Sequence, residues 1–599
     1  MCGIAGFLTK KKLSDSKKIL YKMLEKIKHR GPDADGIYIN KNLFFGHKRL
    51  IVIDPERGTQ PMIYKNYVII YNGEIYNIDE LRKKFFDLNI NLETHCDTEL
   101  VLKSYIYLGD NFLDYLNGIF AFAIYDQEKQ KIFLARDRFG VKPLFYYFDL
   151  DQQNFVFASE IKSLFEFPGI KKSINTNGLR EIFALSPART FGSAIFNNIQ
   201  ELEPSFCLEL KNNNLTKRRY FKLKYIPHKE NIDQTADHVY FLLKQAVERQ
   251  LNSDVPLGTF LSGGLDSSII SAIAKNKINN LQTFSLSFKD NEKYFSKSIL
   301  QPDSDDFWAQ KTHEFIKSEH HKIILNNLDL ADNLELAFYI RDLPGMGDID
   351  SSLLLFCKQI KNYVTVALSG ECADEIFGGY PWFYRDDLNL DNNFFPWMQD
   401  FAIRKDLLKI NLDLKNYARE RYLDLLNDMP EFPENDENEK KKRELFYLNI
   451  NYFMGNMLER KDRMSMANGL EVRVPFCDHE LVEYVFNIPW KIKFYNKREK
   501  AILRHAIEIQ NKNILPKEII WRKKNPYPKT YHPGYEKLIL SLLNKKLKNN
   551  PITEIIDTKK MFDLIKQKKP WYGQLISGPQ LAAYFFQLAC LFEDCTLEI

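Results

Sequence analysis

The first 200 residues alternate short runs of β-branched and aromatic residues with turn-forming residues, a pattern typical of β-strands. Helical spacing of apolar positions interrupts this pattern at residues 16–28 and 98–107, and Asp97 or Thr98 is placed to cap the second helix. The sequence predicts strands at residues 68–71, 119–125, 131–135 and 155–158. This part of the chain is therefore predicted to be an α+β domain.

A different pattern follows the polar segment at residues 211–219 (KNNNLTKRR), which indicates a linker or an exposed hairpin turn. Beyond it, strands alternate with helices, and this favours a parallel α/β sheet. Helices are predicted at residues 235–250 and from about Ser267, and strands at residues 257–261, 283–288 and 365–368. The predicted domains are residues 2–210 and 230–599.

After residue 400 the apolar spacing is mainly helical. The charged segment at residues 430–442 (PEFPENDENEKKK) is predicted to be a solvated loop. Residues 581–592 form the most apolar stretch, but they fall short of the roughly 20 residues that a membrane-spanning helix needs. They are predicted to form a buried helix.

Composition narrows the choice of protein class. The 599 residues are 45% hydrophobic and 27% charged, as in soluble globular proteins, and the formal net charge is only +5. This near balance argues against nucleic acid as a partner. The eight cysteines are scattered, without the spacing of a metal site or the density of a disulfide scaffold. Basic residues follow the apolar N-terminus, the reverse of a signal peptide, so we expect a cytoplasmic protein with no membrane partner.

The first candidate site is the N-terminus, Met1-Cys2-Gly3-Ile4. If Met1 is removed, Cys2 carries both a thiol and a free α-amine, and the amine can act as the base that activates the thiol. This is the arrangement of an N-terminal nucleophile. Taken alone, a cysteine without a role at a processed terminus explains the same residues equally well.

Three further features would serve such a nucleophile. Asn72 and Gly73 offer an amide side chain and a main-chain N–H for an oxyanion hole. Arg49 could hold a carboxylate, and Asp97 could hold an ammonium. Separately, Arg49 and Asp97 are better explained as a salt bridge and a helix cap. Together, the set would recognise an α-amino acid and attack its side-chain carbonyl.

A glycine-rich turn, SGGLDSS at residues 262–268, joins a predicted strand to a predicted helix. N–H groups at such a turn can cradle phosphate, and Asp266 suggests a bridging Mg²⁺. No lysine follows in the spacing of a Walker A loop. An ordinary capped Gly-Gly turn is the plainer alternative.

A second turn, SGECADE at residues 369–375, follows the strand at residues 365–368. Because ligands bind at the carboxyl ends of parallel strands, we expect both turns to face one crevice. Glu371 or Asp374 could bind Mg²⁺ while the other orients or deprotonates a nucleophile. Acids that stabilise a helix N-terminus would give the same pattern.

These motifs together resemble the glutamine-hydrolysing asparagine synthetases. The resemblance covers most of the chain and includes MCGIAGF, HRGPD at residues 29–33, RLIVID from Arg49, YNGEIYN from Tyr71, CDTEL from Cys96, ARDRFGVKPL from Ala135, SGGLDSS, SGECADEIFGGY, DRMSMA from Asp462 and EVRVPF from Glu471. It implies an N-terminal-nucleophile (class II) glutaminase domain, an αββα sandwich. An α/β parallel-sheet ATP-pyrophosphatase domain with a helical C-terminal part would follow.

The resemblance also implies residue roles. Cys2 would be the nucleophile, and Asn72 and Gly73 would form the oxyanion hole. Glutamine would be bound by Arg49, Asn72, Gly73, Glu74 and Asp97. ATP, a co-substrate, would be bound by Ser262, Gly263, Gly264, Asp266, Ser267, Ser268, Leu286, Ser369 and Gly370. Asp266 and Asp374 would bind Mg²⁺, Glu371 would be the acid/base residue, and Lys524 would neutralise phosphate charge.

The implied reaction amidates aspartate through β-aspartyl-AMP, with glutamine as the ammonia donor. An enzyme of the same type that amidates another carboxylate, on a peptide or a secondary-metabolite precursor, remains an alternative. The resemblance suggests a homodimer. Two residues depart from the usual family pattern: Cys372 stands where Gly is usual, and Cys477 where Leu is usual. Cys372 puts the fit around the acyl acceptor in doubt, although a tolerated small residue is the favoured explanation.

Overall fold

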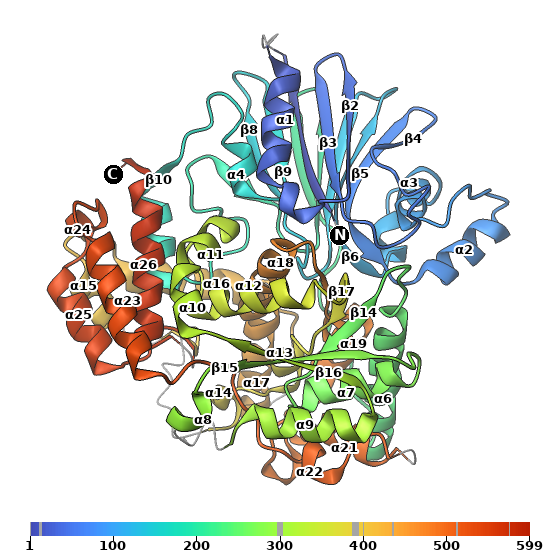
Figure 1. Ribbon diagram of the computed structural model, residues 1–599. Helices are drawn as coiled ribbons and strands as arrows, with labels where there is room; N and C mark the ends of the chain where they lie inside the picture. The colour runs from blue at the N-terminus through green and yellow to red at the C-terminus, as the bar shows by residue number, and fades with distance from the viewer. Residues whose placement is uncertain are drawn as a thin grey trace.

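The computed structural model describes residues 2–10, 15–295, 303–385, 394–398, 401–433, 436–510, 513–573 and 576–598. The chain forms two lobes, with the N-terminal lobe above the larger C-terminal lobe in Figure 1. The N-terminus lies at the junction of the lobes. Among the described residues, no helix combines the length and apolarity needed to cross a bilayer.

Two six-stranded antiparallel sheets build the N-terminal lobe. The first has the order β11-β8-β9-β1-β3-β2, with β1 (Gly3–Thr9), β2 (Ala34–Asn40), β3 (Leu43–Arg49), β8 (Phe145–Asp149), β9 (Asn154–Ala158) and β11 (Ile199–Glu201). The second has the order β13-β12-β7-β6-β5-β4, with β4 (Met62–Tyr64), β5 (Tyr67–Ile75), β6 (Gly118–Asp126), β7 (Lys131–Arg136), β12 (Phe206–Lys211) and β13 (Asn214–Arg219).

The sheets pack face to face because alternate strand residues are apolar. Ile4, Phe45, Ile70 and Leu134 are among the fully buried residues between them. Helix α1 (Ser16–Lys26) covers the outer face of β1 and β3, while α2 (Ile78–Asp87) and α3 (Asp97–Tyr107) belong to the layer outside the second sheet. The predicted αββα sandwich is therefore confirmed.

The four strands predicted in this lobe are confirmed, and each belongs to one of the two six-stranded sheets. Residues 72–74 lie within β5, whereas the sequence pattern had placed them after the strand. The cap of α3 is Cys96, whose sulfur accepts a hydrogen bond from the N–H of Thr98, so the predicted cap at Asp97 or Thr98 is wrong. The polar segment at residues 211–219 forms the hairpin between β12 and β13.

The C-terminal lobe contains the predicted parallel sheet, with the order β16-β15-β14-β17-β18. Its strands are β14 (Leu257–Phe260), β15 (Gln282–Phe288), β16 (Glu319–Leu325), β17 (Val366–Leu368) and β18 (Glu471–Arg473), of which β16 and β18 were not predicted. The helices of the β-α part include α6 (Ile232–Arg249), α7 (Leu265–Lys275), α9 (Asp305–Ile316) and α12 (Asp348–Ile360). The strand order reverses between the neighbouring strands β14 and β17, and such a point is where open α/β sheets bind ligands.

Helices form most of the remaining lobe, as predicted. They include α13 (Ala373–Phe377), α15 (Phe401–Leu407), α16 (Leu414–Leu426), α17 (Glu437–Leu448), α18 (Met454–Met466), α19 (His479–Asn487), α21 (Ala501–Glu508), α23 (Pro533–Lys546), α25 (Thr558–Gln567) and α26 (Pro579–Glu593). The buried helix predicted at residues 581–592 is α26. The loop prediction for residues 430–442 is wrong from Glu437 onward: Asp436 caps α17 there, and residues 434–435 lie outside the described ranges.

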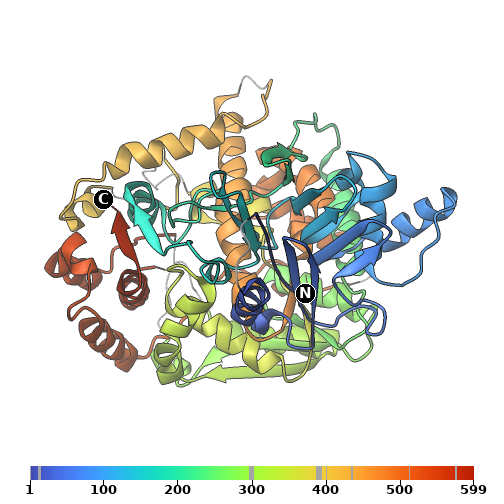
Figure 2. The ribbon, with the colours of Figure 1, turned by 90° about the horizontal axis from the view of Figure 1, so that it is seen from above.

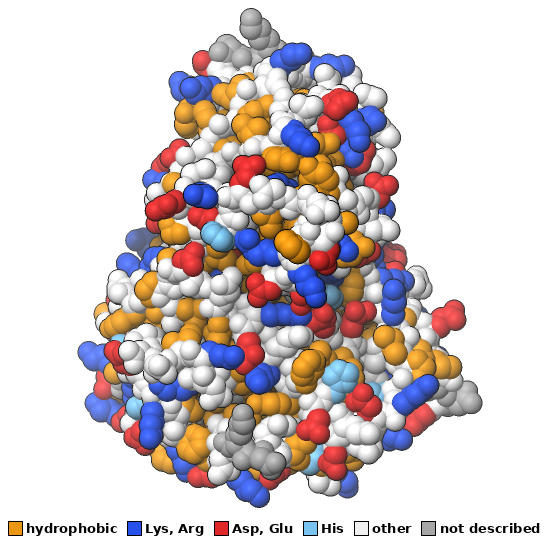
Figure 3. All heavy atoms as spheres, turned by 90° about the vertical axis from the view of Figure 1, so that its right-hand side faces the viewer, with side chains coloured by type: hydrophobic (Ala, Val, Ile, Leu, Met, Phe, Trp, Pro, Cys, Tyr) orange, Lys and Arg blue, Asp and Glu red, His pale blue; other side chains and the backbone are white. Residues whose placement is uncertain are grey.

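The end of the chain returns to the first lobe. Strand β19 (Thr596–Glu598) pairs in parallel with β10 (Ser173–Asn175), and Figure 2 shows the two strands side by side near the C-terminus. Acidic and basic side chains are interspersed over the face drawn in Figure 3, as expected from a nearly neutral composition.

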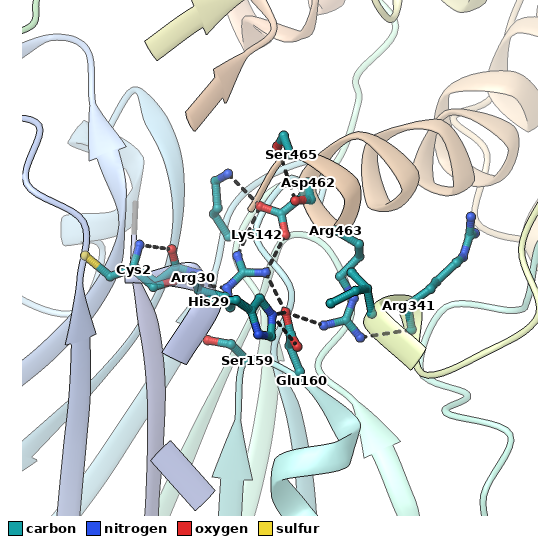
Figure 4. Close-up of polar contacts among 12 residues, drawn as sticks. Cys2, His29, Arg30, Lys142, Ser159, Glu160, Arg341, Asp462, Arg463 and Ser465 are labelled. Carbon is teal, nitrogen blue, oxygen red and sulfur yellow. Dashed lines mark hydrogen bonds and ion pairs between the residues drawn. The ribbon is translucent and has the colours of Figure 1, made fainter. Parts of the chain in front are cut away.

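A buried network of charges joins the lobes (Figure 4). Asp462 of α18 accepts hydrogen bonds from Arg30 at 2.9 and 3.2 Å and from Lys142 at 2.9 Å. Glu160, which follows β9, pairs with Arg30 and with Arg463 of α18, each at 3.0 Å. Burial raises the pKa of Asp462, but Arg30 and Lys142 outweigh it and hold the pKa at about 2.

Replacing Asp462 by Asn should destabilise the protein, because Arg30 and Lys142 would be left buried without their counter-charge. The expected loss is about 3–5 kcal/mol, measured by thermal unfolding at neutral pH. Because the folded-state pKa is depressed, the stabilisation is present above the unfolded pKa of about 4 and is lost as the pH falls toward 2. D462N should lack this acid-dependent step.

The matched control is Asp406→Asn, which removes the exposed partner of Lys560, 2.7 Å away. Its effect should stay within about 0.5 kcal/mol. Equal effects of the two substitutions would contradict a special role for the buried network.

Candidate active sites

Cys2 starts the first sheet and lies, buried, at the lobe junction. Its main-chain nitrogen donates to Asn72 Oδ1 at 3.0 Å, and its carbonyl accepts from Arg30 Nε at 3.1 Å. These two contacts fix the backbone on which the thiol is carried. Burial raises the pKa of the thiol, so a nearby base is needed to form the thiolate at neutral pH.

Asn72 and Gly73 lie beside Cys2 on β5. Because Asn72 Oδ1 accepts from Cys2, its Nδ2 is directed elsewhere, and this buried donor has no hydrogen-bond partner among the described residues. A buried donor without an acceptor lowers the stability of the fold, unless a bound ligand accepts its hydrogen bond. Gly73 is required by packing, since a Cβ there would come within 2.3 Å of the carbonyl oxygen of Ile119.

Two carboxyl groups face the same region. Asp97 Oδ2 accepts from Tyr71 Oη at 2.8 Å and from the N–H of Ile75 at 3.1 Å. Glu74 is buried, with Arg473 of the other lobe 3.7 Å away. Burial, and then the charge of Glu471, raise the pKa of both Glu74 and Asp97. Burial thus outweighs the charge of Arg473 at Glu74, and an ammonium ligand would stabilise both groups as carboxylates.

Arg49 lies at the end of β3, close to this pocket. Its guanidinium donates to main-chain carbonyls of the following loop, to Pro55 at 3.0 Å, Ile53 at 3.3 Å and Asp54 at 2.7 Å. These three bonds use Nη1 and Nη2, the end of the guanidinium that the sequence analysis assigned to a carboxylate, and Nε takes part in none of them. In this structure Arg49 shapes the loop beside Cys2.

The second site is a cavity of about 240 Å³ at the carboxyl ends of the parallel strands. Both glycine-rich turns face it, as predicted. Its lining includes ten of the predicted residues, namely Ser262, Gly264, Asp266, Ser267, Leu286, Ser369, Gly370, Glu371, Asp374 and Lys524. Two predicted residues do not line it: Ser268 is buried within α7, and Gly263 packs against α9. A Cβ at Gly263 would lie 2.3 Å from the main chain of Trp308.

Asp266 and Asp374 both contact Lys500, a residue that the sequence analysis missed. Lys500 Nζ lies 2.7 Å from Asp266 Oδ2 and 2.5 Å from Asp374 Oδ1, and Lys524 Nζ lies 2.5 Å from Asp374 Oδ2. Burial raises the pKa of Asp266, whereas Lys500 and Lys524 overcome the same effect at Asp374 and hold its pKa at about 2.

A divalent cation fits this pair of acids. Asp266 Oδ1 is buried and has no hydrogen-bond partner within the described ranges, and carboxylate oxygens are ligands that Mg²⁺ prefers. In the described part of the chain, no group of three or more Asp, Glu, His or Cys side chains is placed to hold a metal. Oxygens of a bound phosphate would therefore have to complete the coordination.

Glu371 faces the cavity between two cations of α18. Its Oε1 accepts from Lys461 at 2.9 Å and from Arg460 at 3.2 Å. Burial opposes ionisation, but Lys461 and Arg460 prevail and lower the pKa. Glu371 is thus held as a carboxylate. Sequence reasoning missed Arg460, Lys461 and Lys500, because charged residues on a helix ordinarily indicate a solvated face.

Family models match both lobes of the chain. A glutamine amidotransferase domain model matches residues 1–221, and an asparagine synthase model matches residues 238–584. The second match spans more than half of the chain. The chain belongs to the asparagine synthetase family.

Individual relatives extend this match over both lobes. "Asparagine synthetase [glutamine-hydrolyzing] 3" of Bacillus subtilis (strain 168) is 45% identical over 620 residues and covers 100% of both chains. "Asparagine synthetase [glutamine-hydrolyzing] 1" of the same organism is 31% identical, covering 88% of this chain and 87% of its own. "Asparagine synthetase [glutamine-hydrolyzing]" of Rattus norvegicus is 28% identical, covering 84% and 80%. The chain is thus an enzyme of glutamine-dependent amidation with ATP as co-substrate.

The structure explains one departure from the asparagine synthetase pattern. Cys372 has a φ of 77°, in the left-handed region where glycine is preferred, directly before α13. Its side chain is buried against that of Cys477, the other departure, and burial raises the pKa of both thiols. The two unusual residues therefore contact each other, and Cys372 directly follows Glu371 in the chain.

The left-handed backbone at residue 372 predicts that, at this position, a glycine variant is more stable than an alanine variant. Cys372→Gly should be more stable than Cys372→Ala by about 1 kcal/mol, since alanine keeps the strained φ. The order should reverse at Cys357, a buried cysteine inside α12, where alanine should be the more stable by about 1 kcal/mol. Thermal unfolding of the four variants provides the measurement. The same order at both positions would show that φ does not control residue 372.

Proposed function

We propose that this enzyme converts L-aspartate to L-asparagine, with ammonia taken from glutamine. Aspartate would attack ATP to give β-aspartyl-AMP and pyrophosphate, and ammonia would then displace AMP. Glutamine would yield glutamate and ammonia by hydrolysis. The observation that carries this proposal is the shared cavity of Asp266, Asp374, Glu371 and Lys524, in one chain with the Cys2 pocket.

In the glutaminase lobe, Cys2 would attack the side-chain carbonyl of glutamine. Once Met1 is removed, the nitrogen 3.0 Å from Asn72 Oδ1 becomes the α-amine that can take the thiol proton. Asn72 Nδ2 and the N–H of Gly73 would stabilise the oxyanion. Glu74 and Asp97 would bind the substrate ammonium, whose charge would offset the effects that raise their pKa values. Arg49 would affect the binding of the substrate carboxylate indirectly, by holding the loop at residues 53–55 in place.

In the synthetase lobe, the turn at residues 262–268 and the pair Ser369-Gly370 would bind ATP, with Leu286 against the nucleotide. Asp266 and Asp374 would hold Mg²⁺, which supplies charge neutralisation at the phosphates. Lys524 would stabilise charge that develops on the phosphoryl oxygens. Glu371, kept ionised by Lys461 and Arg460, would accept a proton as ammonia attacks the acyl group.

An acceptor assay with purified protein, ATP, Mg²⁺ and glutamine tests this function. We expect pyrophosphate release to depend on aspartate and to equal asparagine formation. The Cys2→Ala variant should form asparagine with ammonium but not with glutamine, because only the nucleophile is lost.

The outcomes separate the two halves of the proposal. If glutamine is hydrolysed while aspartate releases no pyrophosphate, the acceptor is wrong, and the carboxylate of a peptide or secondary-metabolite precursor becomes the next candidate. If Cys2→Ala still uses glutamine, the assignment of the nucleophile fails.

Asn72→Ala tests the oxyanion hole. Loss of one such donor should lower glutamine-dependent synthesis by about 10²–10³-fold. Ammonium-dependent synthesis by the same variant should be unchanged and serves as the internal control for folding. Equal loss of both activities would assign Asn72 a structural role only.

A further inference from the structure

Lys500 occupies the centre of the Asp266–Asp374 pair. The lysine precedes α21, Asp266 lies in the first turn of α7, and Asp374 lies in the first turn of α13, so three separate helices converge on one ammonium. Lys500 is only 2% exposed. The side chains of Asp266 and Asp374 are only 22% and 19% exposed, and Lys500 provides a counter-charge for both at 2.7 and 2.5 Å.

The backbone holds Lys500 in this place. Its φ of 54° lies in the left-handed region, and one turn later Arg504 anchors α21 to the carbonyls of Glu499 and Arg522, each at 2.9 Å. Gly379 leaves room for the lysine, since a Cβ there would come 2.4 Å from Lys500 Cε and 1.9 Å from Asp374 Oδ1. Lys500 is therefore positioned by the fold and does not reach the acids as a flexible surface side chain.

We propose that Lys500 is an internal counter-ion that keeps divalent cations out of the Asp266–Asp374 pair until the nucleotide binds. The inference rests on the proposed binding of ATP and Mg²⁺ in this cavity. A divalent ion that enters without the nucleotide meets an ammonium already bound to both carboxylates, and like charges repel. A triphosphate offers the lysine other anionic partners and brings further oxygen ligands for the metal. Metal binding and nucleotide binding then become coupled.

Mn²⁺ is a suitable probe, because free Mn²⁺ is measured directly by electron paramagnetic resonance. It is titrated into the full chain without nucleotide. Wild type should bind weakly, and Lys500→Met should bind at least about tenfold more tightly, a difference of 1.4 kcal/mol. Lys500→Arg keeps the charge and should behave as wild type. Lys523→Met removes an exposed lysine of the same cavity and should also behave as wild type.

Thermal unfolding of Lys500→Met is the second measurement, and it shows whether the variant folds. The variant removes the ammonium that the two partly buried carboxylates share, so its thermal midpoint should fall and should be raised again by Mn²⁺. Mn²⁺ alone should leave the midpoint of wild type unchanged. Adding Asp374→Asn to Lys500→Met should abolish both Mn²⁺ effects, which identifies the pair as the binding site.

Two results would overturn the proposal: nucleotide-free binding of Mn²⁺ by wild type as tight as by Lys500→Met, or no gain of binding and no Mn²⁺-dependent stabilisation in Lys500→Met. Neither depends on the acyl acceptor. If the aspartate assay fails while Lys500→Met gains Mn²⁺ binding, the acceptor is wrong and the counter-ion role stands. If aspartate is amidated while the gain is absent, only the role of Lys500 fails.

Discussion

The cost of burying charge on α18 constrains the arrangement of the two lobes. Asp462 and Arg463 are almost completely inaccessible to water, and such groups are tolerated only when partners of opposite charge are close. Their partners Arg30, Lys142 and Glu160 belong to the N-terminal lobe, and Arg463 pairs in addition with Asp342 of the C-terminal lobe. Sliding one lobe on the other would break several buried ion pairs at once. The interface therefore has one strongly preferred geometry.

The same helix connects this interface to the synthetase cavity. Arg460 and Lys461 immediately precede Asp462, yet they point to Glu371. Arg30, which holds Asp462, also donates to the carbonyl of Cys2. Polar contacts and the backbone of α18 thus connect Cys2 in one lobe with Glu371 in the other. The two sites are held in fixed relation by charge pairing, in addition to apolar packing.

Sequence reasoning identified the two glycine-rich turns and their carboxylates, but it missed a strand beside them and the cations that contact those carboxylates. The turns at residues 262–268 and 369–375 were predicted because glycine and carboxylates after buried strands are a local signal. β18 was missed because its three residues form a strand only through pairing with β17, a long-range contact. Arg460, Lys461 and Lys500 were missed for a related reason. A buried charge and an exposed charge look alike in a sequence, and only the partners, which lie far along the chain, distinguish them.

The two pockets differ in how their acids are balanced, and the difference follows the ligands proposed for them. Near Cys2, burial and the charge of Glu471 raise the pKa values of Glu74 and Asp97, so an incoming ammonium would stabilise both groups as carboxylates. In the synthetase cavity, two lysines already accompany the acids, which leaves Asp374 with a pKa of about 2. That positive charge would attract a polyanionic nucleotide. The acids near Cys2 and the lysines of the cavity are thus opposite in charge to the ligand groups proposed for them.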